Sequence, residues 1–537
     1  MKRNLLLLAI GLLAFPKTDA QIIKVSPQAT SCSLYQRVDI DVELKGDWEN
    51  PYRQEEARLD MVVTTPDGKN SVVPAFFVNG ESGKKSHWMV RYTPQAKGQL
   101  TYFLRYVQPG MESVSQSYKL NVKEGTGHGI LHTADNWTLR YDDGTPFRGI
   151  GENICWESRA NDDSKYFKKL HEQHDRFNYP AMLPKFAENG GNFARIWMCS
   201  WNFPIDKKNN FNNPRYEACD EPINASAVKR LDETVEMCEK LGIKIMLCIG
   251  AGEARTNNEF FVSEKARAAH RNRLRYVVAR WGYSEAIAMW EFFNEIDNIQ
   301  YRDKNNPIPA KNIVDWHAHM ARYIKSIDAY KHIVTTSISH RDLEGLNSIA
   351  DMDINQKHIY NNTTVIPKTI KDYAQKFGKP YIIGEFGYEW DWSKNFNDFA
   401  GGMDMDFRRG LWYGLFSPTP VTPMSWWWEY FDDRNMQRFF RAPSMVNKEM
   451  LESGNGSFVP CEATADNGQV YAVRCGSKTY VYLFNDSKRA MKEIRVNAKG
   501  ALRELDIEKA KWGKDKKFNG VISTSVKPNA EKVFVIE

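Results

Sequence analysis

Two glutamates near the middle of this 537-residue chain stand where acid–base chemistry is possible. Glu295 closes the apolar run of residues 290–295, and Glu385 lies in the run 381–387, where glycines free the backbone to turn. Carboxyl groups at strand ends can hydrolyse a glycosidic bond when they lie about 5 to 5.5 Å apart, one protonating the leaving oxygen and the other attacking the anomeric carbon. The residue types suit that reaction, but sequence spacing does not give the distance.

The central part of the chain predicts the strands that would carry these acids. From residue 125 to 456, apolar stretches alternate with amphipathic helical ones, as is typical of βα units. Strands are predicted over 147–154, 193–198, 243–249, 286–293, 333–338, 354–360, 381–384 and 423–428, and helices over 225–241, 264–281, 313–327 and 366–377. Eight such units favour an α/β fold of the (β/α)8 TIM-barrel kind, in which functional groups collect where strands run into their following loops.

The two flanking regions have a different texture. Short stretches that alternate with a period of two predict an N-terminal immunoglobulin-like β-sandwich over residues 21–124 and a smaller C-terminal β-sandwich over 457–537. The sandwiches would either bind glycans or brace the barrel. Bracing is favoured, because no row of exposed aromatic residues is recognisable.

The first 20 residues resemble a cleavable secretory signal. Lys2 and Arg3 precede an apolar stretch over 5–15 and a short polar region that ends at Ala20. No later segment approaches the roughly 20 apolar residues of a membrane helix. We therefore expect an exported protein, secreted, periplasmic or at the cell surface, without membrane insertion. A formal net charge of +6 is too small to indicate nucleic-acid binding.

Cysteine usage and short motifs indicate neither a metal nor a cofactor. The eight cysteines show no CxxC or Cys/His ligand spacing, and no phosphate-binding loop is recognisable. Cys461 and Cys475 could form a disulfide across a hairpin in an oxidising compartment or remain free thiols. Nothing in the sequence indicates the oligomeric state.

Most of the predicted strand ends carry polar or aromatic groups. These are Glu152, Asn153 and Trp156 on the first strand, Arg195 and Trp197 on the second, Asn294 and Glu295 on the fourth, His358 and Tyr360 on the sixth, Glu385 on the seventh and Trp426, Trp427 and Trp428 on the eighth. A fourth strand that ends in Asn-Glu and a seventh that ends in Glu resemble the clan A retaining glycoside hydrolases, the superfamily that contains family 5. The resemblance covers residues 129–456.

That resemblance implies roles for individual residues. Glu295 would be the general acid/base, Glu385 the nucleophile and Asn294 a donor to the sugar hydroxyl next to the reacting carbon. Tyr360, in a motif with His358, would hydrogen-bond the nucleophile, and Arg195 would help to keep it ionised. The sandwich and the junction before the barrel resemble modules of secreted bacterial polysaccharide-degrading enzymes.

Several residues keep two interpretations. Glu291 has the strand parity of Glu295 and is expected deeper in the barrel, paired with Arg195 or another cation. Asn153 would either contact substrate or tie loops together. Alternation puts Trp426 and Trp428 on one face of the eighth strand, and we expect that face, with one of its rings flooring the reacting subsite, to meet the sugar.

The leading hypothesis is a retaining glycoside hydrolase that cleaves β-glycosidic bonds in a polysaccharide or oligosaccharide by double displacement. The alternatives are a non-catalytic carbohydrate-binding protein on the same scaffold and a transglycosylase. The sugar, the linkage and the choice between endo and exo action would depend on the long segments 157–180, 199–224 and 389–399, whose shape sequence does not reveal.

Overall fold

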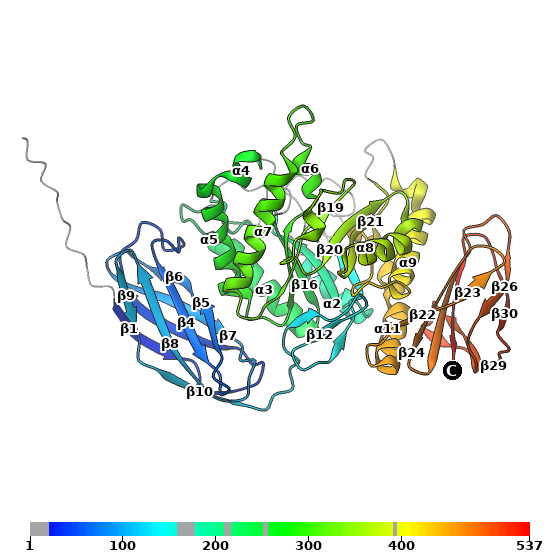
Figure 1. Ribbon diagram of the computed structural model, residues 1–537, viewed down its shortest axis with the longest axis horizontal. Coiled ribbons are helices and arrows are strands. Elements are labelled where there is room, and N and C mark those ends of the chain that lie inside the picture. The colour runs from blue at the N-terminus through cyan, green and yellow to red at the C-terminus, as the bar shows by residue number, and fades with distance from the viewer. Residues whose placement is uncertain (1–20, 158–177, 209–215, 251–255, 390–394) are drawn as a thin grey trace, which may run out of the picture.

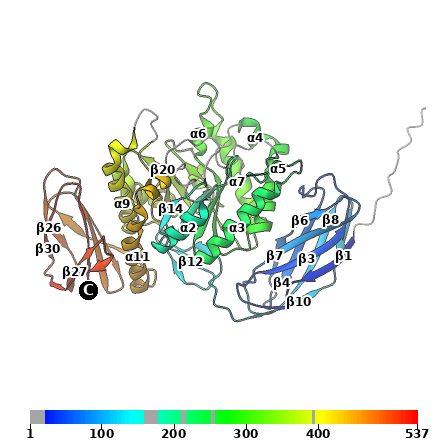
Figure 2. The ribbon, with the colours of Figure 1, turned by 180° about the vertical axis from the view of Figure 1, so that it is seen from behind.

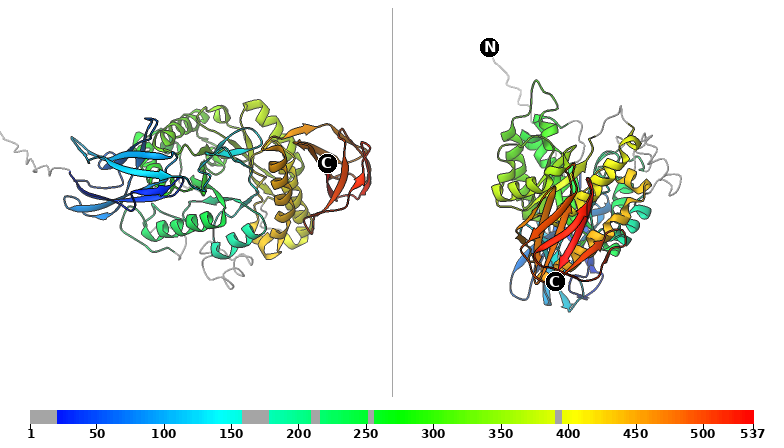
Figure 3. Two further views of the ribbon diagram at one scale, coloured as in Figure 1. Left: turned by 90° about the horizontal axis from the view of Figure 1, so that it is seen from below. Right: turned by 90° about the vertical axis from the view of Figure 1, so that its right-hand side faces the viewer.

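The computed structural model describes residues 21–157, 178–208, 216–250, 256–389 and 395–537. Three units follow one another along the longest axis (Figure 1): an all-β unit, a central unit of helices and parallel strands, and a second all-β unit. The same row is visible from below (Figure 3). The predicted signal segment, residues 1–20, lies outside the described residues.

The N-terminal unit consists of two sheets packed around one core. Its strands are β1 (Gln21–Pro27), β2 (Ser31–Ser33), β3 (Val38–Lys45), β4 (Arg58–Thr64), β5 (Asn70–Pro74), β6 (Phe76–Gly80), β7 (Lys85–Tyr92), β8 (Gly98–Gln108), β9 (Met111–Val114) and β10 (Tyr118–Lys123). One sheet has the order β1-β3-β7-β6 and the other β2-β10-β8-β4-β5, with β9 on β8. In β3 the side chains of Val38, Ile40, Val42 and Leu44 are buried in this core, as the period of two predicts.

Parallel strands run through the central unit in chain order. They are β14 (Gly151–Asn153), β15 (Phe193–Trp197), β16 (Lys244–Gly250), β17 (Ile287–Phe293), β18 (Ile333–Thr335), β19 (Ser337–Ile338), β20 (Asn355–Tyr360) and β21 (Tyr381–Gly387). Each pairs in parallel with its neighbour within the sheets β14 to β18 and β19 to β21. Parallel bridges then join Phe386 to Ser425 and Val421 to Gly149, so the segment 421–425 links the last strand to the first.

Four predicted strands differ from the observed ones by more than one residue. The seventh runs to Gly387, three residues past the predicted end at 384, so Glu385 lies inside it. Pro146–Phe147 forms β13, in a small antiparallel sheet with β11 (Leu131–Thr133) and β12 (Leu139–Tyr141), so the first parallel strand begins only at Gly151. The fifth is interrupted at Thr336. The prediction of a continuous strand over 423–428 was wrong: the segment has one bridge, at Ser425, and single backbone hydrogen bonds from Met424 and Trp426 to β21. Pro423 has no N–H to donate to a ladder, and Trp428 already begins a helix.

Helices cover the outside of the central unit, as the view from behind shows for α2, α3 and α11 (Figure 2). They are α2 (Tyr179–Glu188), α3 (Ala225–Leu241), α4 (Asn258–Val262), α5 (Glu264–Trp281), α6 (Ile296–Gln300), α7 (Ala310–Ile327), α8 (Ile366–Phe377), α9 (Ala400–Leu415), α10 (Trp428–Asp433) and α11 (Arg441–Gly454), with 3₁₀ turns η1 (Leu346–Ser348), η2 (Thr363–Val365), η3 (Phe396–Phe399) and η4 (Met436–Phe440). None of these helices is both long and apolar enough to cross a membrane.

The predicted helices match because their ends are marked in the sequence. α3 begins after Asn224, whose side chain accepts the N–H of Ala227, and ends at Gly242, which adopts a left-handed conformation with φ of 69°. α5 and α8 also have the predicted bounds, whereas α7 starts at Ala310, three residues before the predicted 313.

The C-terminal unit is antiparallel and shares a core with the central unit. Its strands are β22 (Val459–Cys461), β23 (Ala463–Ala465), β24 (Gln469–Cys475), β25 (Lys478–Phe484), β26 (Met491–Val496), β27 (Ala501–Asp506), β28 (Lys511–Trp512), β29 (Lys516–Lys517), β30 (Val521–Val526) and β31 (Glu531–Ile536). They form a sheet β22-β24-β25-β31-β27-β28, with β29 on β27, and a second sheet β23-β26-β30. Tyr482 on β25 packs against Trp412 and Phe416 of the central unit. All eight cysteines lie in the described part and are free, so the possible Cys461–Cys475 bridge is not formed.

Candidate active site

Glu295 lies two residues after the end of β17, at the N-cap of α6. Its backbone is left-handed, with φ of 49° and ψ of 58°, a conformation that residues other than glycine adopt rarely. The backbone N–H of Glu295 donates a 2.9 Å hydrogen bond to Oγ of Ser337. The preceding residue, Asn294, accepts a 2.8 Å hydrogen bond at Oδ1 from Nη2 of Arg195. The turn therefore fixes the two polar residues that close β17.

Glu385 lies inside β21 and is almost completely buried. Its Oε1 accepts a 2.6 Å hydrogen bond from Nη1 of Arg195, and its Oε2 accepts a 2.5 Å bond from the hydroxyl of Tyr360. Nδ1 of His358 lies 3.2 Å from the same Oε2. Oε1 of Glu385 thus has a donor on β15, and Oε2 has donors on the adjacent strand β20.

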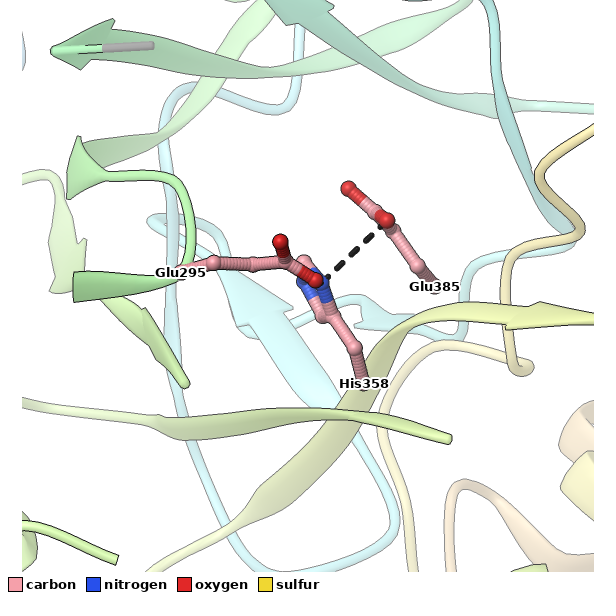
Figure 4. A group of neighbouring side chains, drawn as sticks. All are labelled: Glu295, His358 and Glu385. Carbon is pink, nitrogen blue, oxygen red and sulfur yellow. Dashed lines mark hydrogen bonds and ion pairs between the residues drawn. The ribbon is translucent and has the colours of Figure 1, made fainter. Parts of the chain in front are cut away.

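The imidazole of His358 lies between the two glutamates (Figure 4). Its Nδ1 is 2.9 Å from Oε1 of Glu295 and 3.2 Å from Oε2 of Glu385. One atom from each of the three side chains, a carboxylate oxygen from either acid and a ring nitrogen, lies within 4.8 Å of the others. The two acids that stand 90 positions apart in sequence therefore meet at one point.

Burial and the neighbouring charges have opposite effects on the pKa values of Glu385 and His358. Burial by itself would raise the pKa of Glu385, but the positive charges of His358 and Arg195 and the hydrogen bonds from His358 and Tyr360 lower that pKa below its usual value. Burial would lower the pKa of His358, yet the charge of Glu385 and hydrogen bonds to both acids raise it to about 9. Glu385 is accordingly held ionised and His358 protonated near neutral pH.

Arg195 uses all of its donor groups on the protein. Nε and Nη2 bind the two carboxylate oxygens of Glu291 at 2.7 and 2.8 Å, in addition to the bonds to Asn294 and Glu385, and Nη1 also reaches Asn153 at 3.3 Å. Arg195 and Glu291 are fully buried. Glu291 thus occupies the deeper, cation-paired position that strand parity predicts, away from the open end.

Asn153 has a framework role and not the predicted substrate contact. It is fully buried, and its amide Nδ2 donates to the backbone carbonyls of Gly384, Met424 and Ser425 at 2.9 to 3.0 Å. Its Oδ1 accepts from Arg195. These bonds tie β14 to β21 and to the segment 421–425. Of the two roles considered from the sequence, Asn153 therefore has the one of tying parts of the chain together.

Two of the three consecutive tryptophans join an aromatic cluster, although not through strand alternation. Trp426 and Trp428 both pack against Trp156, at centroid distances of 5.5 and 4.8 Å, and Trp426 also lies 5.4 Å from Trp197. Trp427 instead packs on Phe396. Because Trp428 is only 1 % exposed, it packs inside the protein, and the expectation that its ring meets a sugar was wrong. Trp426 is half-buried and remains accessible.

Glu295, His358 and Glu385 also offer the kinds of atom that bind metal ions. The hydrogen-bonding pattern fits a metal ion poorly, because the Nδ1 that faces both carboxylates is occupied by a proton when His358 is charged. Arg195 and Tyr360 already supply donors to Glu385. The arrangement suits proton transfer and attack by a carboxylate.

Two contacts of Glu295 were missed from the sequence. Asn298 donates from Nδ2 to Oε2 of Glu295 at 2.9 Å, and Ser337 accepts its backbone N–H. Asn298 lies three positions after Glu295 on α6, so predicting a short helix after residue 295 would have placed both side chains on one face. Ser337 gave no such signal, because a serine inside an apolar strand looks like any other strand residue.

Comparison with known proteins identifies the class. Residues 134–419 match the family model described as "Apiosidase-like, catalytic domain", and residues 31–106 match a domain of unknown function, DUF5060. The chain is 25 % identical over 183 residues to mannan endo-1,4-beta-mannosidase A of Aspergillus aculeatus, covering 31 % of this chain and 45 % of that one. It is 26 % identical over 203 residues to the enzyme of the same name from Podospora anserina, covering 31 % and 52 %.

The chain thus spans about half the length of these relatives. A solved protein from Bacteroides vulgatus ATCC 8482, which carries a provisional glycoside hydrolase name, superposes with a TM-score of 0.65 at 12 % identity over 95 % of this chain and 100 % of that one. That likeness concerns the fold.

Together with the two converging carboxylates, the family match identifies residues 134–419 as a glycoside hydrolase catalytic domain of the TIM-barrel type. Since its family model covers more than half of the residues, the chain belongs to the family of the Apiosidase-like catalytic domain.

Proposed function

We propose that this enzyme is a retaining glycosidase for β-linked sugars, in which Glu385 is the nucleophile and Glu295 the general acid/base. The observation that carries the proposal is the distance between the acids: a carboxylate oxygen of each lies within 4.8 Å of the other. Retaining enzymes hold their carboxyl groups about 5 to 5.5 Å apart, whereas inverting enzymes need about 6.5 to 9.5 Å to admit a water.

The surroundings of the two acids support a division of roles. Glu385, 3 % exposed and held ionised by Arg195 and His358, suits direct attack on the anomeric carbon. Glu295 is more accessible, with a side chain 19 % exposed, which suits a group that exchanges protons with the leaving group and with water. In the first step Glu385 would form the glycosyl bond while Glu295 protonates the departing oxygen. In the second step Glu295 would take a proton from the water that releases the sugar.

The remaining assignments follow from position. Asn294 has its Oδ1 held by Arg195, which leaves its amide N–H groups for a sugar hydroxyl. Tyr360 donates to Glu385 and would adjust as the charge of that acid changes. Trp426 would provide an apolar surface for the bound ring. The parallel strands, joined through 421–425, would close as a complete (β/α)8 barrel, and residues 1–20 would direct export.

The substrate class follows from the relatives and is part of the proposal. The two fungal relatives are named mannan endo-1,4-β-mannosidases, so β-mannans head the substrates to be tried, followed by other plant and microbial β-linked polysaccharides and their oligosaccharides. Polysaccharide degradation outside the cytoplasm would then be the biological role.

The test is a screen of purified residues 21–537 against β-linked polysaccharides and aryl β-glycosides, beside Glu385→Ala, Glu295→Ala and Glu291→Gln. We expect turnover by the parent with initial retention of the β-configuration, detected by ¹H NMR, and loss of turnover in Glu385→Ala. Azide should restore activity to Glu295→Ala by attacking the glycosyl-enzyme to give a β-glycosyl azide. An α-configured first product, or unchanged turnover in both alanine variants, would overturn the proposal. Products longer than the substrate would indicate transfer to sugar in place of water.

A further inference from the structure

Glu295 is held by three different elements, and only one of these contacts comes from an exposed side chain. Its backbone N–H donates to Ser337 on β19, its Oε1 faces Nδ1 of His358 on β20, and its Oε2 accepts from Nδ2 of Asn298 on α6 at 2.9 Å. Ser337 and His358 are buried, whereas Asn298 is exposed. Asn298 is therefore the contact that lies on the open side of the acid.

The short helix that carries Asn298 is firmly anchored. The preceding residue, Asp297, is fully buried and accepts the backbone N–H groups of Ser339 at 2.7 Å and of His340 and Arg341 at 3.0 Å. These three bonds fix α6 against the segment that follows β19. Asn298 consequently presents its amide from a fixed backbone, although its side chain is exposed.

Because of these contacts, both oxygens of Glu295 accept hydrogen bonds from N–H donors. Donors from two different elements, β20 and α6, thus hold the carboxyl group at both of its oxygens. They also fix the rotation of the carboxyl group, and general-acid catalysis depends on that orientation. Among the described residues, the side chains of His358 and Asn298 contact the carboxylate. His358 is shared with Glu385, whereas Asn298 acts on Glu295 alone.

We infer that Asn298 is a positioning residue for Glu295, one that sets the orientation of the acid/base carboxyl group. This inference rests on the proposed roles of Glu295 and Glu385. Asn298 acts through Glu295, and its removal changes the steps in which a proton moves to or from that acid.

The test compares Asn298→Ala and Asn298→Asp with Asn306→Ala, a control at an exposed asparagine whose backbone N–H donates to Asp303. The probes are aryl β-glycosides of the sugar that the screen identifies, with leaving groups from 2,4-dinitrophenol, which departs without a proton, to phenol, which needs one. For Asn298→Ala we expect kcat/KM to fall about tenfold on the phenyl glycoside and by less than about twofold on the dinitrophenyl glycoside.

The aspartate variant gives a second readout. Asn298→Asp keeps the size of the side chain but replaces the donor group with an acceptor, so it should show the same leaving-group dependence as Asn298→Ala. Equal losses on both substrates, or values equal to those of Asn306→Ala, would overturn the inference. Glu295→Ala on the same substrates tests the proposed function separately: without leaving-group dependence in that variant, the assignment of the acid itself fails.

Discussion

Nη1 of Arg195 donates a 2.6 Å hydrogen bond to Oε1 of Glu385, and both side chains are at least 97 % buried. The same guanidinium binds Glu291 through two further donors, so one cation stabilises two buried carboxylates. Removing one partner of a buried charge pair leaves the other uncompensated, which costs about 3 to 5 kcal/mol. The position therefore links folding stability to the charge of Glu385.

We predict that Arg195→Lys weakens catalysis and shifts its pH dependence. Lysine retains the charge but has three donors on one nitrogen, and it cannot reproduce the planar contacts to both acids. With less positive charge close to Glu385, its carboxylate becomes harder to ionise, so the acid limb of kcat/KM moves to higher pH. Measured pH profiles of kcat/KM for parent and variant check this, with Glu291→Gln as the matched change on the other side of Arg195. An unmoved acid limb in a folded Arg195→Lys variant would contradict it.

A second prediction concerns stability at alkaline pH. In the folded protein the pKa of His358 is raised to about 9, from about 6.5 in an unfolded chain. A group with a raised folded pKa contributes stability fully below its unfolded pKa and loses it as pH rises through the folded value. The melting temperature of the parent should therefore fall between about pH 6.5 and pH 9. His358→Asn should show a flatter dependence in this window, while His128→Asn, at an exposed histidine, should follow the parent.

Glu385 affects the pH dependence of folding stability in the opposite direction from His358. Its folded pKa is lowered, so its stabilising contribution is present above the pKa of an unfolded glutamate and disappears as pH falls through the lowered value. Thermal scans of Glu385→Gln in acid measure this contribution. The parent should lose more stability than the variant between about pH 4.3 and the lowered folded pKa, and parallel curves would refute the assignment of a lowered pKa.

The elements that sequence predicted well are those with local signals. Asn224 and Gly242 mark the two ends of α3, and the alternation of Val38 to Leu44 marks the buried face of β3. The strand predicted over 423–428 failed because an apolar run does not distinguish a strand from a loop that leads into a helix. The role of Asn153 depends on carbonyl groups more than 200 positions away, which no local pattern reveals.

The fourth prediction separates two tryptophans of one cluster. Trp426 is half-buried, and Trp428 is 1 % exposed beneath Trp156. Trp428→Ala should destabilise the fold by about 3 to 5 kcal/mol, because a large buried ring leaves a cavity. Trp426→Ala should retain most of the stability but raise KM, since it removes surface that is open to a ligand. Denaturant unfolding and steady-state kinetics on both variants check this, and a KM effect confined to Trp428→Ala would reverse the assignment.

The last prediction tests whether the C-terminal sandwich braces the central unit. Tyr482 is fully buried, its ring stacks on Phe416 at 5.7 Å and on Trp412 at 5.9 Å, and its hydroxyl donates to Glu531. These contacts belong to a core that continues from α9 into β25, so the two units should unfold together. Tyr482→Ala should lower the melting temperature of the whole chain and the half-life of activity on heating. Its ability to bind insoluble polysaccharide at low temperature should be unchanged.

Tyr482→Phe provides the matched control, because it keeps the stacked ring and removes only the hydroxyl. Its loss of stability should be about 1 kcal/mol, the usual net contribution of one hydrogen bond, or somewhat more because the partner is an acid. A braced architecture requires the alanine variant to lose far more than the phenylalanine variant, in a single transition. If Tyr482→Ala instead produced a separate early transition while the activity survived heating as in the parent, the sandwich would be independent of the central unit. Loss of polysaccharide binding in that variant would then favour a glycan-binding role.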